Sequence, residues 1–206
     1  MYLPKQFNHP EHARSIILEN PFASLVSNDD EGFPFISHIP IKLMPHATDA
    51  QQDMLLGHVA KGNPHAGFLY KRPQVLLTFM GPQAYMSPAV YPDLIRVPTW
   101  SYVAVHVKAE VRILEGEEAK DALLKQLIAD HEPAYAQQWR GLPETYTHPM
   151  MNAIVAFEMK LLEVQTKVKL NQHRPEAHAA MLAAYDAGNE SEKALALWMR
   201  RLGLVS

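Results

Sequence analysis

The sequence lacks several residue types and patterns on which common protein chemistries depend. It contains no cysteine, which excludes disulfides, thiolate nucleophiles and cysteine-ligated metals or clusters. No apolar run is long enough to cross a bilayer, and the N-terminus has no apolar signal-peptide core. We therefore expect a soluble, cytoplasmic protein that makes no membrane contact.

Basic stretches and glycine-rich phosphate loops are missing too. The 206 residues carry a formal net charge of -3, and no run of Lys or Arg exceeds the pair at Arg200 and Arg201. Such a chain has no general attraction for phosphate backbones, so charge does not predict nucleic-acid binding. Neither a GxGxxG fingerprint nor a P-loop occurs, which argues against a doubly wound nucleotide-binding fold.

Motifs of hydrolytic and metal chemistry are also absent. None of the serines lies in a GxSxG elbow, which gives little support for a hydrolase. Of the 11 histidines, only His9 and His12 form a closely spaced pair, and no HExxH motif occurs. We therefore expect no metal site.

What is present indicates a fold built mainly from strands. Strands are expected over residues 22–27, 33–43, 54–59, 75–79, 103–114 and 152–170, because these runs are apolar, alternating or rich in β-branched residues. Helices are expected over 10–19, 117–132 and 176–202, the last one broken near Gly188, while 61–73 reads as a loop with one helical turn. This order predicts a mainly β (α+β) fold, a β-barrel with peripheral helices, as one main domain.

The segment 81–106, GPQAYMSPAVYPDLIRVPTWSYVAVH, concentrates aromatic, hydroxyl and proline residues. Its four prolines cannot all lie inside regular elements, so a rigid irregular loop is expected. Flat rings and hydroxyls on such a loop suit a planar heteroaromatic ligand with polar edges. The alternative is that the rings only close the mouth of a barrel.

Three further clusters mix cations, amides and hydroxyl or imidazole groups: SHIP at 37–40, GHVAKGNP at 57–64 and KLNQHRP at 169–175. In the second cluster, Lys61, His58 and Asn63 have the chemistry to bind an anion such as a phosphate. The alternative is that Lys61 is a solvated loop lysine, as most lysines are.

These clusters occur together with MYLPKQF at 1–7, GPQAYMSPAVY at 81–91 and VPTWSYVAVH at 97–106, in an order that resembles the PaiB family of FMN-binding transcriptional regulators. That family belongs to the FMN-binding split-barrel group, and the resemblance runs nearly end to end. It implies a six-stranded split barrel that forms a homodimer, with an FMN pocket built at the subunit interface from both chains. The barrel domain would span 1–170, and a helical appendage would span 171–206.

The resemblance also implies which residues bind the cofactor. Phosphate binding would fall to His58, Lys61 and Asn63, and the ring and ribityl contacts to Ser37, His38, Thr78, Trp100 and Tyr102. Gln172 and Arg174 would close the site from the partner subunit. The chain departs from the family pattern at Ala66, Ser101, Asn171 and His173, and these changes are expected to alter flavin affinity or orientation.

Two classes of function remain open at this stage. The resemblance implies a negative transcriptional regulator, with DNA as a partner by family analogy alone; direct binding would need a basic patch near Arg200 and Arg201 or near Lys167 and Lys169. The alternative is a flavin-dependent oxidoreductase that uses FMN and a reduced pyridine nucleotide. Haem binding through His106 or His173 is a third and weaker hypothesis, because no axial ligand is identifiable.

Overall fold

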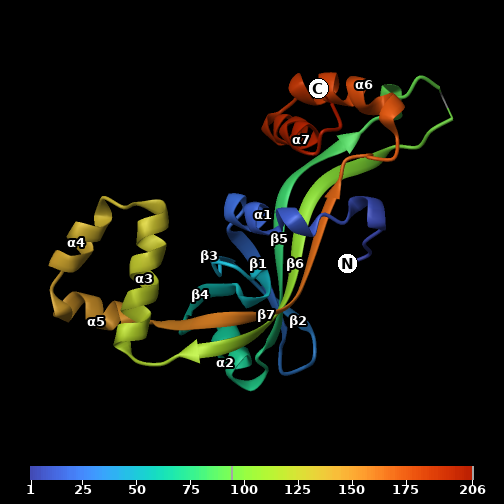
Figure 1. The fold of residues 1–206 in the computed structure, drawn as a ribbon. Helices are drawn as coiled ribbons and strands as arrows, with labels where there is room; N and C mark the ends of the chain where they lie inside the picture. Colours follow the sequence, from blue (N-terminus) through green and yellow to red (C-terminus); the bar gives the residue numbers. More distant parts are fainter. Residues whose placement is uncertain (94, 206) are drawn as a thin grey trace. The chain divides into compact units, whose positions relative to one another are not determined.

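Seven strands form one sheet in the order β2-β1-β5-β6-β7-β4-β3 (Figure 1). The computed structural model describes residues 1–93 and 95–205. Pairs β1/β2, β1/β5, β3/β4 and β4/β7 are antiparallel, so the predicted mainly β, α+β fold is confirmed. The strands are β1 Phe22–Asn28, β2 Pro34–Pro40, β3 Lys42–Met44, β4 Met54–Ala60, β5 Gln74–Met86, β6 Thr99–Leu114 and β7 Ile154–Lys169.

Helices lie at the N-terminus, between strands and at the C-terminus. None of the helices within the described residues has the length and apolar character that a bilayer crossing requires. The α-helices are α1 Ala13–Glu19, α2 Pro64–Lys71, α3 Glu117–His131, α4 Tyr135–Gly141, α5 Glu144–Asn152, α6 His178–Asp186 and α7 Glu190–Arg201. Short 3₁₀ turns are η1 Lys5–Phe7, η2 Pro10–His12, η3 Ala50–Gln52, η4 Pro88–Val90 and η5 Pro175–Ala177.

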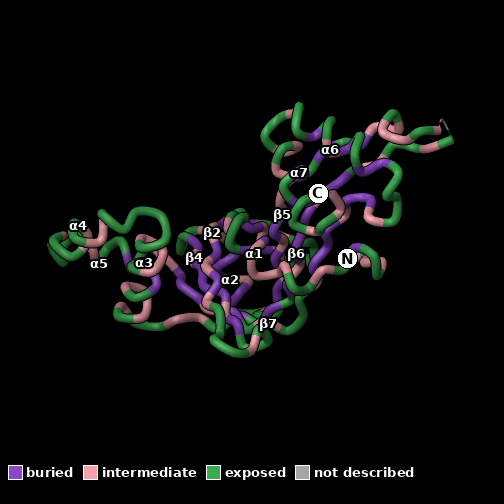
Figure 2. Tube along the Cα trace, turned by 45° about the horizontal axis from the view of Figure 1, so that its top comes forward, coloured by how far each residue is buried: buried purple, intermediate pink, exposed green. Residues whose placement is uncertain are grey.

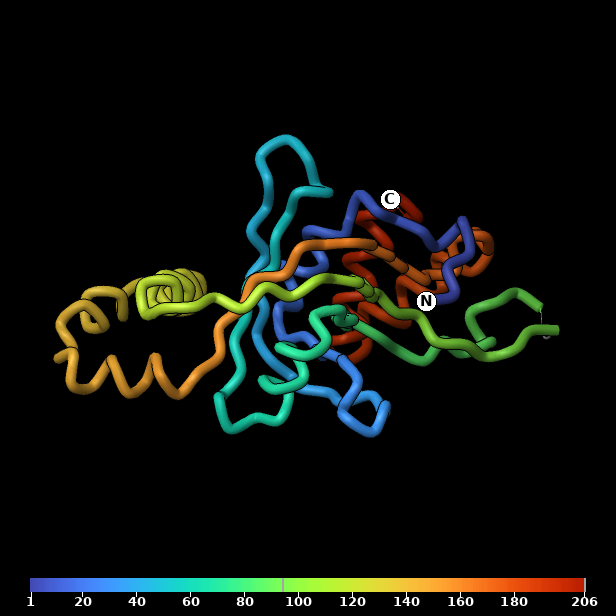
Figure 3. Tube along the Cα trace, turned by 90° about the horizontal axis from the view of Figure 1, so that it is seen from below, coloured from blue at the N-terminus to red at the C-terminus, as the bar shows by residue number. Residues whose placement is uncertain are grey.

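The chain divides into two compact units. Unit 1 contains Met1–Asn20, Phe79–His106 and Val164–Ser206, and unit 2 contains Pro21–Thr78 and Val107–Glu163. Strands β5, β6 and β7 each contribute residues to both units. Within unit 2, helices α3, α4 and α5 form an excursion that leaves the end of β6 and returns into β7 (Figure 3).

The core of unit 2 follows from the alternation of its strands. On paired strands β4 and β7, Gly57 lies opposite Phe157, and the side chains of Leu55 and Met159 are fully buried on the same face. A Cβ at Gly57 would lie 2.8 Å from Ile41 Cδ1 and 3.0 Å from Phe157 Cε2, so only glycine fits there. In Figure 2 the buried positions of this unit run along the strands, whereas α4 and α5 are largely exposed.

The expected irregular loop over 81–106 is much shorter in the structure. Strand β5 runs to Met86 and includes Pro82, and β6 already begins at Thr99. Next to Pro82, Gln83 N–H donates to Ser191 Oγ (2.8 Å) and the Ser191 hydroxyl donates to Gln83 O (2.7 Å), so the backbone of β5 bonds a side chain of α7 here. Leu94 of this segment lies outside the described residues.

Three other expectations need correction. The strand expected over 33–43 is divided at Ile41, whose N–H donates to Pro21 O (2.9 Å), and this break yields seven strands rather than six. The segment 61–73 holds a helix of two turns, α2, instead of one turn. Helices α4 and α5 were not expected, because their sequence carries little apolar periodicity and their residues are mostly exposed.

Candidate functional site

A buried polar network surrounds the first predicted cofactor residue, Ser37, in unit 2. Asn63 Nδ2 donates to Ser37 Oγ (3.0 Å), and His65 Nδ1 lies 2.9 Å from the same oxygen. The other ring nitrogen of His65 lies 3.0 Å from Ser27 Oγ, and His65 is fully buried. Burial lowers the pKa of His65, so the neutral ring is favoured. Ser37 therefore has a structural role in joining β2 to α2.

The start of α2 explains why Asn63 belongs to this network. Its Oδ1 accepts the N–H of His65 (3.0 Å), which caps the helix, and Pro64 occupies the first helical position. With both ends of its side-chain amide engaged, Asn63 shapes the turn that follows β4. The phosphate contact predicted for Asn63 stays a prediction.

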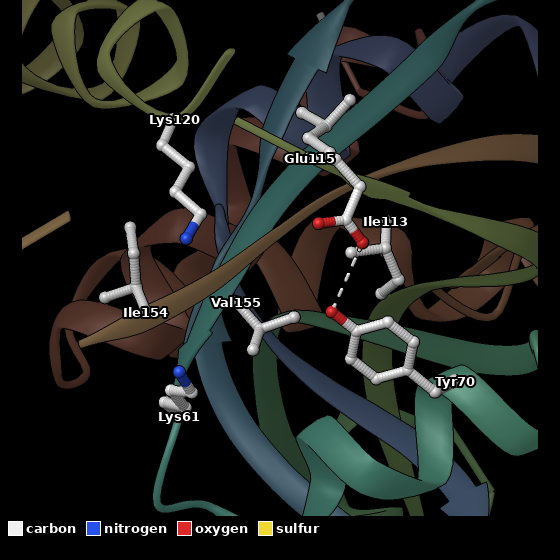
Figure 4. Close-up of a pocket in the computed structure, with 8 residues that line it drawn as sticks. Lys61, Tyr70, Ile113, Glu115, Lys120, Ile154 and Val155 are labelled. Atoms are coloured by element: carbon white, nitrogen blue, oxygen red, sulfur yellow. Dashed lines mark hydrogen bonds between the residues drawn. The ribbon is translucent and has the colours of Figure 1, made fainter. Parts of the chain in front are cut away.

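Lys61 lies at that turn, in a pocket of about 130 Å³. Its ammonium has no hydrogen-bond or ion-pair partner within the residues that the structure describes. In Figure 4 the ammonium groups of Lys61 and Lys120 lie on one side of the pocket, and the pair formed by Tyr70 and Glu115 lies on the other. Tyr70 Oη donates to Glu115 Oε1 at 3.5 Å, and Lys120 Nζ donates to the carbonyl of Met151 at 3.2 Å.

His58 precedes Lys61 on β4, opposite Ala156 of β7. Its Nδ1 atom is buried and finds no hydrogen-bond partner within the described part of the chain. Burial lowers the pKa of His58, because the charged ring would lose its hydration. This atom can therefore form one further hydrogen bond. Leaving a buried nitrogen without a partner costs free energy.

His38 and Thr78 lie in a row across three strands. Ser24 on β1 is paired with His38 on β2 and with Thr78 on β5, so the three side chains share one face of the sheet. Ser24 Oγ lies 3.0 Å from His38 Nδ1. Phe22 and Ile36 flank this row, and 67% and 52% of their surfaces are exposed. The face therefore combines a polar row with uncovered apolar side chains.

The predicted residues of unit 1 surround Lys169. Its ammonium donates to Thr99 Oγ1 and to Trp100 O (2.8 Å), and it lies 5.9 Å from the centre of the Tyr102 ring. Lys167 lies 5.2 Å from the same ring and donates to Tyr2 O (2.9 Å). Burial, and then the charge of Lys167, lower the pKa of Lys169. The Trp100 side chain is more than half exposed, whereas Tyr102 is half-buried between the two cations.

Gln172 and Arg174 differ in how free their side chains are. Gln172 Oε1 accepts from Leu170 N–H (3.0 Å), and Gln172 Nε2 donates to Val168 O (2.6 Å). The side-chain amide of Gln172 is therefore bound to the backbone of the residues just before it. Arg174 is exposed, and its guanidinium has no side-chain partner within the described residues. Of these two, Arg174 is available to an anion.

The positions that depart from the family pattern have structural roles of their own. Ser101 accepts a hydrogen bond from buried Tyr185 (2.8 Å), and His173 packs edge-on against Phe7. Asn171 adopts a positive φ of 61° and donates from Nδ2 to Tyr91 Oη (2.9 Å). Ala66 is buried in α2. Ser101 therefore lies in the interior of unit 1.

The structure thus brings Ser37 together with Asn63, and His38 with Thr78, in unit 2, where His58 and Lys61 also lie. Trp100, Tyr102, Gln172 and Arg174 belong to unit 1. Sequence reasoning missed His65, which holds Ser37, and Lys120, which shares the pocket of Lys61. No sequence signal distinguishes Lys120 from the other lysines on helix surfaces.

The fold resembles that of two proteins of known structure whose names refer to a flavin or a haem group. Flavocytochrome Anf3 from Azotobacter vinelandii matches with a TM-score of 0.59 at 14% identity, over 80% of this chain and 69% of that chain. The FAD and heme binding protein from Mycobacterium smegmatis matches with a TM-score of 0.58 at 14% identity, over 79% and 72%. At these identities the likeness shows the fold, and it confirms the predicted split barrel.

Sequence comparison identifies the family. A curated relative from Bacillus subtilis (strain 168), "Protease synthase and sporulation protein PAI 2", is 31% identical over 185 residues, which cover 85% of this chain and 84% of that protein. This match confirms the resemblance to the PaiB family. Residues 1–163 match the family model described as "Putative FMN-binding domain". The chain therefore belongs to this FMN-binding family, of which the B. subtilis protein is a relative.

Proposed function

We propose that this chain binds FMN and that unit 2 holds the cofactor's phosphate at the pocket of Lys61. The observation that carries the proposal is the free ammonium of Lys61 beside that of Lys120 in a pocket of about 130 Å³. FMN is the cofactor that family membership gives to this chain. The pocket is below the range of roughly 300–1,000 Å³ that holds whole small ligands, and its size suits a phosphate group rather than the entire cofactor.

The groups at this site fit a phosphate dianion. Two ammonium groups supply charge-assisted donors, and the one acidic side chain in the pocket, Glu115, is engaged by Tyr70. His58 is not among the residues that line this pocket, so the phosphate contact predicted for it stays a separate prediction. Removing the ammonium of Lys61 should therefore weaken FMN binding by about 1.5–3 kcal/mol, or roughly 10- to 100-fold.

The flavin ring would be received by the face that carries His38, Ser24 and Thr78. The row offers one imidazole and two hydroxyl groups, and Phe22 and Ile36 supply apolar surface beside it. A planar ring with a polar and an apolar end needs both kinds of surface. Ring contacts by Trp100 and Tyr102, and contacts by Arg174, remain predictions that substitution and titration with FMN can test separately.

The same face supports a homodimer. Phe22 and Ile36 are each more than half exposed in unit 2, and large uncovered apolar side chains gathered on a sheet are typical of an interface. An isologous contact between two copies would cover them. Sedimentation of the purified protein should give twice the monomer mass of 23.3 kDa.

For the physiological role, we propose a transcriptional regulator that does not bind DNA through a basic patch of its own. Arg200 is paired with Asp186 (2.6 Å) and Arg201 with Glu19 (2.9 Å), and Lys167 and Lys169 donate to neighbouring oxygens within unit 1. The charges of Arg200 and Arg201 are therefore compensated by carboxylates, whereas the oxygens that Lys167 and Lys169 bond are uncharged. Doubling the net charge of -3 gives -6 for a dimer, which opposes DNA binding. A mobility shift at low salt that retains DNA would contradict this proposal.

The second candidate is a flavin-dependent oxidoreductase. Bound FMN would supply the hydride and electron chemistry, which leaves the protein to bind and orient it, so no acid–base residue is required of the chain. The ion pairs of Arg200 and Arg201 and the negative net charge favour this candidate over a DNA-binding protein. Anaerobic bleaching of the bound flavin by NADH or NADPH would support the oxidoreductase, and an unbleached flavin would support the regulator.

A further inference from the structure

Three potential metal ligands meet near the N-terminus, in unit 1. His9 directly precedes η2, and Glu11 and His12 lie within it. One ligand atom from each of the three residues lies within 4.8 Å of the other two. We propose that His9, Glu11 and His12 bind a divalent transition metal of borderline softness, such as Zn²⁺, which nothing in the family assignment provides for.

The 3₁₀ geometry of this turn explains why the sequence pattern did not reveal the site. With three residues per turn, positions i and i+3 eclipse each other, so His9 and His12 face the same side. Their ring centroids lie 6.0 Å apart. The better known HExxH pattern places its histidines four apart on an α-helix, and a search for that spacing passes over His9 and His12.

The distances are close to those of a metal site. His9 Nδ1 lies 3.0 Å from Glu11 Oε1, and His12 Nε2 lies 3.9 Å from the same oxygen. Zinc bonds of about 2.0–2.1 Å at a tetrahedral angle place ligand atoms roughly 3.3 Å apart. Small side-chain rotations therefore suffice to form three bonds, and a water molecule would complete the four ligands.

The surroundings favour the protonation states that a metal requires. Burial lowers the pKa of His12, and a backbone hydrogen bond, followed by the bond to His9, lowers the pKa of Glu11. Neutral imidazole and ionised carboxylate are the ligand forms. Metal binding at Nδ1 would require neutral His9 to carry its proton on Nε2, so the Gln172 amide, whose Nε2 lies 3.4 Å from that atom, would turn away to avoid facing a second donor.

Arg201 affects the metal affinity of the proposed site, and Trp198 offers a way to measure metal binding. Arg201 lowers the pKa of His12 through its charge and would also repel a cation, but its ion pair with Glu19 (2.9 Å) offsets part of that repulsion. The Trp198 ring meets His12 edge-on, 5.2 Å between ring centroids, and is only 3% exposed. A paramagnetic metal bound to His12 would therefore quench the fluorescence of Trp198.

Calorimetric titration of the chelator-treated full chain with Zn²⁺ tests the site. We expect one equivalent per chain with micromolar or tighter affinity, weakened by at least about tenfold in Glu11→Gln and in His12→Ala. The matched control is His148→Ala, because His148 also pairs with a glutamate, Glu117 (2.6 Å), yet belongs to no group of three potential ligands among the described residues. That variant should bind Zn²⁺ as the parent does.

Fluorescence with Co²⁺ or Cu²⁺ provides a second reading that does not depend on stability. Quenching should saturate at one equivalent of metal in the parent protein and be much weaker in Trp198→Phe. In His12→Ala, one equivalent of metal should cause no quenching. Circular dichroism would confirm that each variant is folded. The proposal is overturned if no saturable binding occurs. It is equally overturned if Glu11→Gln and His12→Ala bind Zn²⁺ as tightly as His148→Ala.

Discussion

Ser37→Ala should destabilise the protein far more than the loss of one hydroxyl group at its surface would. The hydroxyl lies between His65 Nδ1 (2.9 Å) and Asn63 Nδ2 (3.0 Å), and Ser37 is only 8% exposed. Its removal leaves a nitrogen of fully buried His65 without a partner, which costs about 1–3 kcal/mol. The amide of Asn63 is less buried and can turn to water, which adds about 0.5 kcal/mol.

The total of about 1.5–3.5 kcal/mol is measurable by urea and thermal denaturation. For a chain of this size it corresponds to a fall in Tm of roughly 3–14 °C. Ser24→Ala is the matched control, because Ser24 also bonds a histidine, His38 (3.0 Å), but on an exposed face, where the cost should be about 0.5 kcal/mol or less. A loss below about 0.5 kcal/mol for Ser37→Ala would refute the reasoning.

The same variant separates two roles for Ser37. Its hydroxyl is committed to the network, so folded Ser37→Ala protein should bind FMN within about twofold of the parent, which is less than one ordinary hydrogen bond contributes. If stability is unchanged and FMN affinity falls about tenfold, Ser37 belongs to the cofactor site, as the family resemblance implies.

Three further predictions follow from the packing and charges of unit 2. Gly57→Ala should lower the free energy of unfolding by about 1–3 kcal/mol in chemical denaturation, because its Cβ would lie 2.8 Å from Ile41 Cδ1. Gly67→Ala in α2 is the control: no atom lies within 4 Å of the new Cβ, so the free energy of unfolding should rise by about 0.5–1 kcal/mol. Equal effects of the two substitutions would contradict the packing described. Burial lowers the pKa of His58 and of His65 below the ordinary histidine value of about 6.5, so the unfolded chain binds more protons than the folded chain below that pH. The free energy of unfolding should therefore fall by up to about 1.4 kcal/mol per pH unit and per histidine as the pH drops below about 6.5, and urea midpoints that do not move between pH 7 and pH 5.5 would argue against it. Ile36→Glu should convert the proposed dimer to a monomer in sedimentation. The control Leu162→Glu should leave the dimer intact, although Leu162 and Ile36 are equally exposed, at 52% each. A persistent dimer in Ile36→Glu would place the interface elsewhere.

Periodicity predicted the parts of the fold where burial alternates regularly. Strand β6 shows this best, because Val103, Val105, Val107, Ala109 and Val111 are buried and the residues between Val107 and Val111 on the other face are exposed. The break before α7 was also readable, since Asn189 and Glu192 form a capping box after Gly188. Local signals of this kind depend on neighbouring residues and so survive in the sequence.

The site was less predictable because its contacts connect distant residues. Residue types drew attention to Lys61, but its pocket is completed by Lys120 from α3. Ser37 carries the chemistry of a ligand contact, yet His65, 28 positions away, engages its hydroxyl. The prolines of 81–106 suggested a loop, whereas β5 continues through Pro82 to Met86, and its backbone at Gln83 bonds Ser191, 108 positions later. Such pairings are fixed by the tertiary fold rather than by spacing.

The most direct test of the proposed phosphate pocket compares FMN with riboflavin, which is the same flavin without the phosphate. Affinities would be measured by flavin fluorescence for the parent, Lys61→Ala and the control Lys193→Ala, whose lysine lies on exposed α7 and pairs with Glu190 (3.0 Å). We expect FMN to bind more tightly than riboflavin, and Lys61→Ala to lose roughly 10- to 100-fold in FMN affinity while its riboflavin affinity stays unchanged. If Lys61→Ala binds FMN as the parent does, or weakens both flavins equally, the pocket of Lys61 does not hold the phosphate.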